Sequence, residues 1–393
     1  MYMQLINSIL STIKRELLYV VRDRLYLSLL IVLPLIMILF FAVMFTGGSI
    51  SSLPIVLVDR DNSEMSRRLI SMVDATKGVN IDYEAMSIDG AERLMLSGKA
   101  VAILYIEDGF ESNIYRGIPT QVECYISGAS ISASGVAERD IQQAVRTFSA
   151  GVALNKLQSL GVSHSQALVD IMPINFHIYT ISNPYLNYGY YLAPIFMFMG
   201  IVIFTMLSTI FAIGRELYYA TAHEWIDGAS GMLFAGVVGK LLPITILMSL
   251  LMQLIFFVLF VVMGMECIGN YLMLTLGSIL FIIAYQSVAV AIISVTANLR
   301  LALSLGGGYS VMAFTFSGIT FPAMSMYGVA QLLSKLFPLT YFSDIFIDQA
   351  MRGVPVYKDI KELLFLLIFL ILMPLIWQRL RRVVTIDKYF SKD

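Results

Sequence analysis

The feature that most constrains this chain is a series of long apolar stretches without charged residues. A helix needs roughly 20 residues to cross the ~30 Å hydrocarbon core of a membrane. The stretches predicted to span it are residues 25–46, 186–214, 241–265, 268–299, 301–322 and 363–378. The last is the shortest and would reach only ~24 Å, so Lys361 and Arg379 are expected to complete it by snorkelling. The pattern predicts an α-helical polytopic membrane protein with six transmembrane helices.

The charge content supports this class and excludes others. Only 13% of the 393 residues are charged and 58% are hydrophobic, whereas a soluble domain carries about 25% charged residues. A disordered chain, a nucleic-acid-binding protein and an ordinary cytosolic enzyme are excluded, and the net charge of −1 indicates no polyanionic partner. The two cysteines, Cys124 and Cys267, cannot build a disulfide framework or a zinc cluster. Whether they pair with each other stays open.

Lysine and arginine in the short loops indicate the orientation. With the N-terminus in the cytoplasm, the cytoplasmic segments hold twelve basic residues and the short outer loops hold four. Cytoplasmic loops of membrane proteins carry the excess of basic residues. Both termini are therefore expected in the cytoplasm, with residues 379–393 as a cytoplasmic tail and residues 323–362 as an outer re-entrant or loop segment.

The polar block between the first two stretches, residues 47–185, predicts an inserted mixed α/β extracytoplasmic domain. Alternating or continuous apolar runs indicate strands, and apolar residues at helical spacing indicate helices. The predicted strands are residues 54–59, 79–83, 100–106, 121–126 and 175–181. The predicted helices include residues 63–73 and the long segment 131–160.

The histidines of this block do not form a recognisable site. A catalytic interpretation would use His164, His177 and Asp170 with nearby serines. These residues show neither a nucleophile elbow nor metal-ligand spacing. We interpret residues 163–165 as a turn and His177 as part of a strand, and we expect no catalytic, cofactor-binding or metal site in this chain.

The predicted spans contain no ionisable residue, which bears on the source of energy. Carriers driven by protons or sodium usually keep such residues at membrane depth. In this sequence, Glu266 is the only charged residue between Lys240 and Arg300. A nucleotide-binding P-loop needs G-x-x-x-x-G-K-[ST], and the closest stretch, residues 231–236, is followed by Val237. If the chain moves a substrate, we expect a separate ATPase to drive it.

Residues 1–24 form the first candidate contact surface on the cytoplasmic side. Apolar residues from Leu5 to Val20 fall on one helical face, and the charged residues lie largely elsewhere. This pattern is typical of an interfacial helix along the inner leaflet; the alternative is an extension of the first span. The charged residues of interest in this segment are Lys14, Glu16, Arg22 and Asp23.

Residues 215–240 form the second candidate surface. The stretch from Arg215 to Trp225 is polar, aromatic and compatible with a helix, and residues 228–231 break it. A short helix here would project an indole and carboxylates into the cytoplasm, where they could dock in a partner's groove. The alternative is an ordinary connecting loop with an interfacial tryptophan.

Several motifs occur in the order of a known family. They are Lys14-Arg15-Glu16, Arg22-Asp23-Arg24 and Pro34; then Arg215-Glu216, Thr221, Glu224-Trp225 and Gly239-Lys240; then residues 317–322 and 336–341. In this order they resemble the ABC-2 type permeases, the transmembrane subunits of ATP-binding-cassette exporters. The large outer domain resembles the drug-efflux-like branch of that family.

Residues 215–240, which resemble the coupling-helix loop of the family, depart from the family pattern in three places. Ala220 stands where the family usually has glycine, and small residues around Ala229 replace a common proline. One residue is inserted before Lys240, so either His223 or Glu224 could match the family's glutamate.

The resemblance implies a transporter of two permease subunits, as a homodimer or with a related permease, and two ATPase subunits that hold ATP and Mg. This chain would then be no enzyme itself. Gly306, Gly307 and Gly308 would allow close helix approach. The transporter would lie in a bacterial inner membrane. It would work with a periplasmic adaptor of the membrane-fusion type. The residues that would couple the chain to the ATPase are Arg215, Glu216, Thr221, His223, Glu224 and Trp225.

The expected function is therefore export of a hydrophobic or amphipathic small molecule, drug-like or lipid-like, from the cytoplasm or inner membrane. One alternative is a membrane-anchored sensor or scaffold with an outer ligand-binding domain. Another is an ion-coupled carrier, which the lack of ionisable residues in the predicted spans disfavours.

Overall fold

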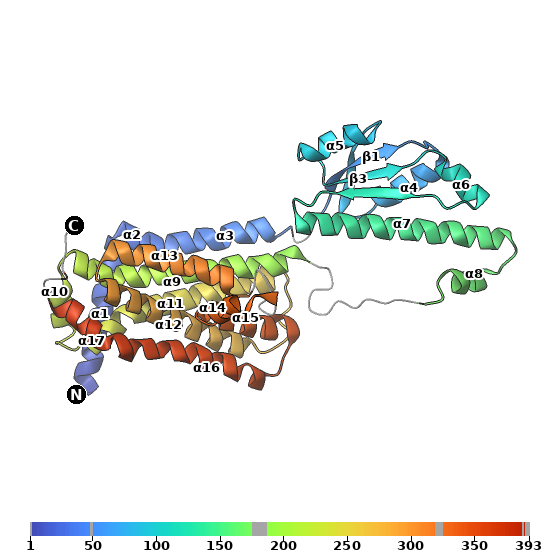
Figure 1. Cartoon of the computed structure of the whole chain (residues 1–393). Helices are drawn as coiled ribbons and strands as arrows, with labels where there is room; N and C mark the ends of the chain where they lie inside the picture. Colours follow the sequence, from blue (N-terminus) through green and yellow to red (C-terminus); the bar gives the residue numbers. More distant parts are fainter. Residues whose placement is uncertain (1, 48–49, 175–186, 319–324, 387–388, 390–393) are drawn as a thin grey trace. The chain divides into compact units, whose positions relative to one another are not determined.

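The chain is described here from a computed structural model, which covers residues 2–47, 50–174, 187–318, 325–386 and 389. It divides into two compact units, one formed by Met1–Gly48 with Thr180–Asp393 and the other by Ser49–Tyr179. The first unit is helical, and the second contains the sheet (Figure 1).

The helical unit begins with α1 (Tyr2–Arg22), which crosses the end of a bundle (Figure 1). Asp23 then leaves the helical conformation (φ −93°, ψ 108°), and its side chain accepts hydrogen bonds from the first amides of α2 (Arg24–Leu27). This cap turns the chain into the bundle, where α2 continues through η1 (Ser28–Val32) into α3 (Leu33–Phe45).

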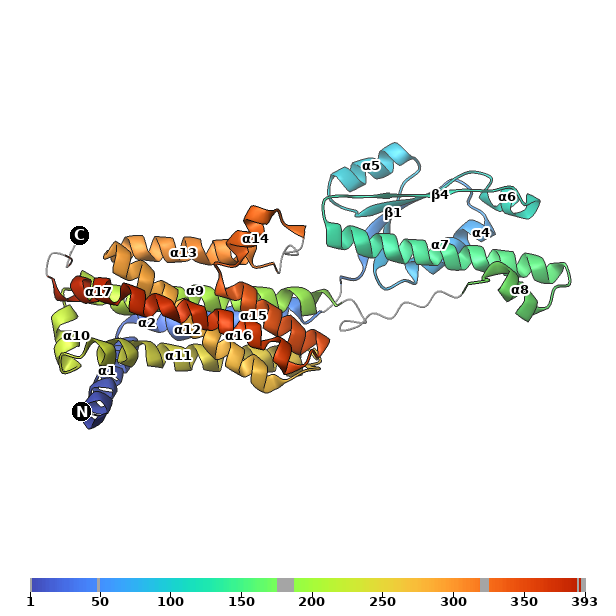
Figure 2. The same ribbon diagram turned by 60° about the horizontal axis from the view of Figure 1, so that its bottom comes forward.

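The rest of the helical unit follows the inserted α/β unit and packs alongside α3 (Figure 2). Its long helices are α9 (Tyr188–Tyr218), α11 (Leu233–Phe257) with η2 (Val258–Val262), α12 (Tyr271–Thr296) and α13 (Leu299–Phe316). Its shorter elements are α10 (Ala222–Gly228), α14 (Gly328–Ser334), α15 (Pro338–Phe346), η4 (Ile347–Arg352), η5 (Val356–Lys358), α16 (Ile360–Ile368), η6 (Phe369–Ile371) and α17 (Leu372–Thr385).

Five helices among the described residues are long and apolar enough to cross a membrane. They correspond to five of the six predicted spans, and they are Arg24–Phe45, Tyr188–Tyr218, Leu233–Val262, Tyr271–Thr296 and Val356–Thr385. The last predicted span, residues 363–378, lies within a helix of 30 residues, which is ~45 Å long at 1.5 Å per residue. The helix continues past Lys361 and Arg379, since charged residues end an apolar stretch without ending a helix.

The remaining predicted span, residues 301–322, corresponds only in part to α13. This helix has 18 residues, carries Arg300 in its first turn and contains three consecutive glycines, which together lower its apolar character. Residues 319–322 lie outside the described residues. The structure thus supports a multi-pass bundle with five long apolar helices. Helix α13 is not among these five.

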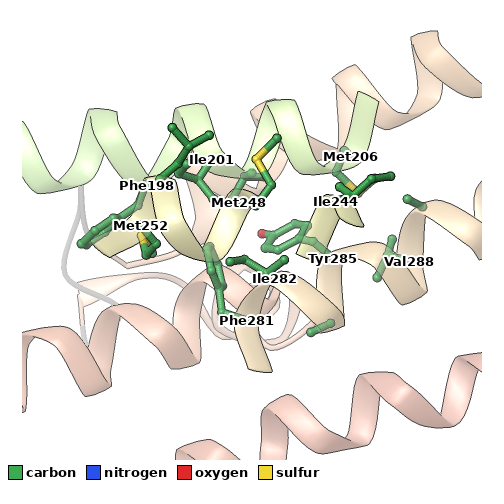
Figure 3. Close-up of a cluster of buried hydrophobic side chains, with 14 of the residues drawn as sticks. Phe198, Ile201, Met206, Ile244, Met248, Met252, Phe281, Ile282, Tyr285 and Val288 are labelled. Atoms are coloured by element: carbon green, nitrogen blue, oxygen red, sulfur yellow. The ribbon is translucent and has the colours of Figure 1, made fainter. Parts of the chain in front are cut away.

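Helix α9 is the centre of the bundle. Of its most apolar stretch, 72% is buried, against 22% for Arg24–Phe45 and 6% for Val356–Thr385. It packs against α3, α11, α12 and α13. Side chains of α9, α11 and α12 point toward one another between these helices (Figure 3), among them Phe198, Ile201, Met248, Met252, Phe281 and Tyr285.

At the end of the bundle remote from α10, the end of α3 lies next to the start of α9. A Cβ atom on Gly189, at the start of α9, would lie 2.8 Å from the carbonyl oxygen of Phe45, the last residue of α3. The same end is closed by Gln349 of η4, whose Nε2 donates to Asp359 Oδ2 at 2.6 Å. Its Oε1 accepts from the amide of Asn270, which caps α12, at 2.8 Å.

The inserted unit is a four-stranded mixed sheet of order β2-β1-β3-β4. β1 (Leu53–Asp59) pairs in parallel with β2 (Val79–Glu84) and β3 (Ala102–Ile106), and β3 pairs antiparallel with β4 (Val122–Ile126). These four strands confirm the predictions at residues 54–59, 79–83, 100–106 and 121–126, with shifts at their ends. The predicted strand at residues 175–181 lies outside the described residues, as does His177.

The alternation of side chains along β1 explains how helices cover both faces of the sheet. Ile55 and Leu57 pack with α4 (Glu64–Asp74), α6 (Phe110–Arg116) and α7 (Ile131–Ser159). Val56 and Val58 pack on the other face with α5 (Ile88–Leu96). Helices α4 and α7 confirm the two predicted helical segments. The predicted turn at residues 163–165 was wrong, because Ser163 caps α8 (His164–Ile171).

Asp140 of α7 fastens this helix to the sheet. Its Oδ2 accepts a 2.8 Å hydrogen bond from the amide of Gly78, immediately before β2, and its side chain is largely buried. We expect Asp140→Ala to lower the free energy of unfolding of this unit by about 1–3 kcal/mol, because the buried amide loses its acceptor. Hydrogen exchange of the β1 and β2 amides in the full chain measures this loss.

The matched control is Glu138→Ala, which removes an exposed carboxylate from the same helix and should change exchange little. Equal protection in the Asp140→Ala and wild-type proteins would contradict the assignment.

Candidate functional site at the α10 loop

The segment between α9 and α11 folds as a turn, a short helix and a second turn at one end of the bundle (Figure 1). The predicted short helix is confirmed as α10, and it ends at Gly228, the first of the residues 228–231 that were expected to break it. The chain reverses through left-handed residues, Ala220 (φ 56°) before α10 and Gly231 (φ 75°) after it. α10 packs against α1, α9, α11 and α17.

A fully buried ammonium group joins three of these helices. Lys240 of α11 has no exposed side-chain surface, and its Nζ donates to Glu16 Oε2 at 2.7 Å and Glu216 Oε1 at 2.8 Å. The third hydrogen bond goes to the carbonyl oxygen of Ala212 at 3.1 Å. An ammonium has three donors, so Lys240 is fully hydrogen-bonded. Because Glu16 belongs to α1 and Glu216 to α9, one side chain holds α1, α9 and α11 together.

The other carboxylate oxygens are also occupied. Glu16 Oε1 accepts from the Tyr26 hydroxyl in α2 at 2.7 Å. Glu216 Oε2 accepts from the Thr221 hydroxyl, in the turn before α10, at 2.5 Å, and from Arg15 Nη2 at 3.1 Å. Buried charges are stable only when they are paired and hydrogen-bonded, and both carboxylates meet this condition. We name the following residues the ion cluster: Arg15, Glu16, Arg215, Glu216 and Lys240.

The two arginines of the ion cluster are placed differently. Although burial lowers the pKa of Arg15, the neighbouring Glu216 carboxylate raises it, and the net shift is upward, so this guanidinium stays charged. Arg215 Nη2 lies 3.9 Å from both Glu16 Oε2 and Glu216 Oε1, beyond hydrogen-bond distance. Its guanidinium instead stacks on Tyr19, with Cζ 4.0 Å from the ring centroid.

Small polar side chains attach α1 to the end of α10. Ser8 Oγ donates to Ser230 Oγ at 2.9 Å, and Ser11 Oγ donates to the carbonyl oxygen of Gly228 at 2.8 Å. Together with the ion cluster, these bonds fix the turn before α10 and the turn after it to the same helix. α10 therefore cannot shift without straining its bonds to α1.

The amphipathic helix expected at residues 1–24 is present, and its polar face is the buried one. α1 lies so close to α11 that a Cβ on Gly239 would be 2.5 Å from Thr12 Cβ. Glu16 lies on this buried polar face, whereas Lys14 and Arg22 are exposed. An apolar stripe at helical spacing faces outward on the opposite side, formed by Met3, Ile6, Leu10, Leu17 and Val21.

Trp225 points into the molecule, and the expectation that its indole projects outward was wrong. The side chain is 1% exposed, its Nε1 donates to the Gly236 carbonyl oxygen at 3.2 Å, and its ring centroid lies 5.0 Å from Lys240 Nζ. Burying the large aromatic ring seats α10 on α11. Arg215 and Glu216 are likewise buried, so they act behind the surface of the loop.

The outer face of α10 carries the remaining predicted residues. His223 and Glu224 are exposed, together with Asp227 one turn further along, and Thr221 is half-buried. This face is polar and mainly acidic, and a short rigid helix of this kind is suited to docking in a groove of a partner. Asp227 was not among the predicted contact residues.

Sequence reasoning also missed the role of Lys240. The predicted span began at residue 241, whereas α11 begins at Leu233 and contains Lys240. Glu216 similarly lies inside α9. Both residues thus lie in helices that continue the predicted spans, just outside the span bounds at residues 214 and 241. The sequence did contain a signal for this role, because Lys240 is the only charged residue in the apolar segment Leu233–Phe257.

The three glycines predicted to allow close helix packing differ from one another. A Cβ on Gly306 would lie 2.5 Å from Ile210 Cδ1, so α13 and α9 approach closely there. Gly307 and Gly308 have nothing within 4 Å in the described part of the chain. Cys124 and Cys267, whose pairing the sequence left open, are both free thiols.

Comparison with known families gives a match over most of the chain. Residues 24–377, from the start of α2 into α17, match the family described as ABC-2 family transporter protein. The resemblance read from the sequence motifs is thereby confirmed. No curated protein matches the chain.

The ion cluster makes a strong prediction for stability. Lys240→Met would leave two buried carboxylates without their shared counter-charge, and we expect the free energy of unfolding to fall by about 3–5 kcal/mol. Thermal unfolding of the purified chain measures this.

Arg352→Met serves as the control, because it breaks an exposed ion pair with Asp348 worth about 0–1 kcal/mol. A Lys240→Met protein as stable as the wild type would refute the structural role of the ion cluster.

The turn before α10 makes a second prediction. Ala220 has φ 56°, a left-handed conformation that costs a non-glycine residue about 1–2 kcal/mol. We expect Ala220→Gly to raise the melting temperature. In contrast, Ala229→Gly should lower it, because Ala229 is buried and has a negative φ of −91°. A destabilised Ala220→Gly protein would show that the methyl group of Ala220 outweighs this backbone strain.

Proposed function

Because the chain belongs to the ABC-2 family of transporter proteins, we propose that this permease subunit works in an ATP-driven exporter whose separate ATPase subunit binds the α10 loop. ATP and Mg would be held by that ATPase. The two other functions open to the sequence, a sensor or scaffold and an ion-coupled carrier, gain no support from the ion cluster, since its charges are used in fixing helices to one another.

The observation that carries the proposal is that α10 is fixed on its buried side to the helices of the bundle. Its exposed face, with His223, Glu224 and Asp227, is available to a partner. Its buried side is fixed through Trp225 and the ion cluster to α11, α9 and α1. A displacement imposed on α10 would therefore move long helices of the bundle as rigid bodies, which is the requirement for mechanical coupling.

We place the α10 end of the bundle on the cytoplasmic side of a bacterial inner membrane. The start of α1 and the end of α17 lie at this end together with α10 (Figure 1), so both termini would be cytoplasmic. The excess of basic residues in these segments supports the orientation. Since the inserted α/β unit joins the opposite end of α9, it would then be extracytoplasmic.

We further propose that α13 is the sixth span and that two permease subunits assemble, as a homodimer or with a related chain. Gly307 and Gly308 are open to a neighbour, and small residues allow helices to approach closely in membranes. The proposed use of a periplasmic membrane-fusion adaptor is supported by family resemblance alone.

The proposed cargo is a hydrophobic or amphipathic small molecule, drug-like or lipid-like. A groove of about 420 Å³ between α1, η1 and α11 supports this, because its lining is almost entirely apolar, with Leu17, Ile31 and Leu247 among the lining residues. Its volume lies within the roughly 300–1,000 Å³ of small-molecule sites.

Binding of the ATPase subunit tests the proposal. We expect Glu224→Ala combined with Asp227→Ala to weaken co-purification with the ATPase and to lower ATP hydrolysis by the complex about fivefold or more, as for loss of an interface contact of at least 1 kcal/mol. The melting temperature should stay unchanged, because both side chains are exposed.

Glu266→Ala is the matched control, since it removes an exposed carboxylate between η2 and α12. Unchanged assembly and turnover of the Glu224→Ala/Asp227→Ala protein would reject α10 as the docking element. Transport on an ion gradient without nucleotide would reject the ATP-driven mechanism as a whole.

A further inference from the structure

A cationic pocket lies next to the ion cluster, where the end of α1 meets the end of α9. Its volume is about 510 Å³, within the roughly 300–1,000 Å³ of small-ligand sites. Three arginines line it, Arg22, Arg24 and Arg215. Tyr19, Tyr219 and the half-buried Thr221 complete its walls on the α1 and α9 sides.

The charges of this pocket are not balanced by its own residues. Asp23 is the one acidic residue that lines it, and Asp23 Oδ1 already accepts hydrogen bonds from the amides of Leu25 and Tyr26. The Thr221 hydroxyl donates to Glu216. Three guanidinium groups therefore line the pocket together with one carboxylate, which is engaged as a helix cap.

Arg215 is the buried part of this imbalance. Its side chain is 5% exposed, yet neither Nη1 nor Nη2 has a hydrogen-bond partner within the described residues. The ion cluster contains three cations, Lys240, Arg15 and Arg215, and only two carboxylates. Lys240 and Arg15 occupy those carboxylates at hydrogen-bond distance. Arg215 keeps only its two longer ion pairs, at 3.9 Å, to Glu16 and Glu216. Because buried donors of a charged group are costly without a hydrogen bond, an acceptor from outside the chain would stabilise Arg215.

We propose that this pocket binds a phosphate-bearing anion, and that its source is the headgroup of an anionic phospholipid. Phosphate oxygens match the planar fork of a guanidinium and accept two parallel hydrogen bonds from it. Arg215 would bind the phosphate from the buried side. Arg22 and Arg24, both exposed, would complete its neutralisation from the open side.

The surroundings of the pocket favour a lipid over a soluble anion. Val21 and Leu25, which flank the two exposed arginines, are themselves 73% and 55% exposed. Apolar side chains beside arginines on an amphipathic helix are the pattern of a segment at a membrane surface that attracts anionic lipid. This step rests on the proposed placement of α1 at the cytoplasmic membrane surface.

The experiment compares the full chain in lipid nanodiscs of phosphatidylcholine with and without phosphatidylglycerol. Native mass spectrometry counts retained phosphatidylglycerol, and thermal unfolding reports the stabilisation. We expect Arg22→Gln and Arg24→Gln each to weaken retention about fivefold, as for loss of one basic residue at an anionic surface. Arg215→Gln should abolish the stabilisation by phosphatidylglycerol. Lys14→Gln, the matched control, removes an exposed charge of α1 that does not line the pocket and should leave both readouts unchanged.

A second arm identifies the source of the anion. The chain in neutral detergent is titrated with inorganic phosphate against chloride at equal ionic strength. Arginine-dependent stabilisation by phosphate alone would support the anion site and assign it to a soluble ligand. Equal losses in Lys14→Gln and the pocket variants, or no response to either anion, would overturn the proposal.

A third arm separates this proposal from ATPase docking. Release of phosphatidylglycerol when the ATPase subunit binds would assign the pocket to a carboxylate of that partner and overturn the lipid assignment. If the Glu224→Ala/Asp227→Ala chain no longer binds the ATPase but still retains the lipid, the lipid site is supported, and it is independent of ATPase docking at α10. Loss of retention in Arg22→Gln with normal ATPase binding would likewise support the pocket, because docking would be intact.

Discussion

One buried ammonium group, that of Lys240, determines how the α10 end of the bundle is built. Within a membrane, the hydrophobic effect does not bring helices together, because lipid tails are as apolar as the side chains they would leave. Packing and polar contacts must then specify which helices meet and in what register. Lys240 does this for three helices at once, through hydrogen bonds to Glu16, Glu216 and the backbone of α9.

The same constraint explains why α1 has its polar face inside. A soluble amphipathic helix buries its apolar side, whereas α1 buries Ser8, Thr12 and Glu16 and leaves Leu10 and Leu17 exposed. That arrangement is stable only if the outward apolar stripe meets another apolar medium. In the proposed orientation the bilayer surface provides that medium, and the buried polar face holds the α10 loop.

Most of the local structure could be predicted from the sequence, because its signals are local. The apolar run at residues 54–59 indicated a strand, which is β1 and is buried on both faces. The apolar spacing of residues 131–160 indicated α7. The contacts of the α10 loop could not be predicted in the same way. Glu16 and Lys240 are 224 positions apart, and no periodicity relates them. Trp225 was misleading, since an indole in a polar loop is compatible both with an exposed contact residue and with a buried residue that packs the loop against the bundle. Ala220 gave a useful one: it stands where the family usually has glycine, and its backbone is left-handed.

The close approach of Gly189 to Phe45 has a consequence for the history of the chain. Because the end of α3 and the start of α9 are neighbours, a short loop could join these two helix ends in a chain without the insert. A domain inserted between adjacent positions of its host can be gained, lost or exchanged without disturbing the host. The bundle and its loop machinery could thus be inherited as one module, while the accessory domain diversified separately with the molecules each descendant came to handle.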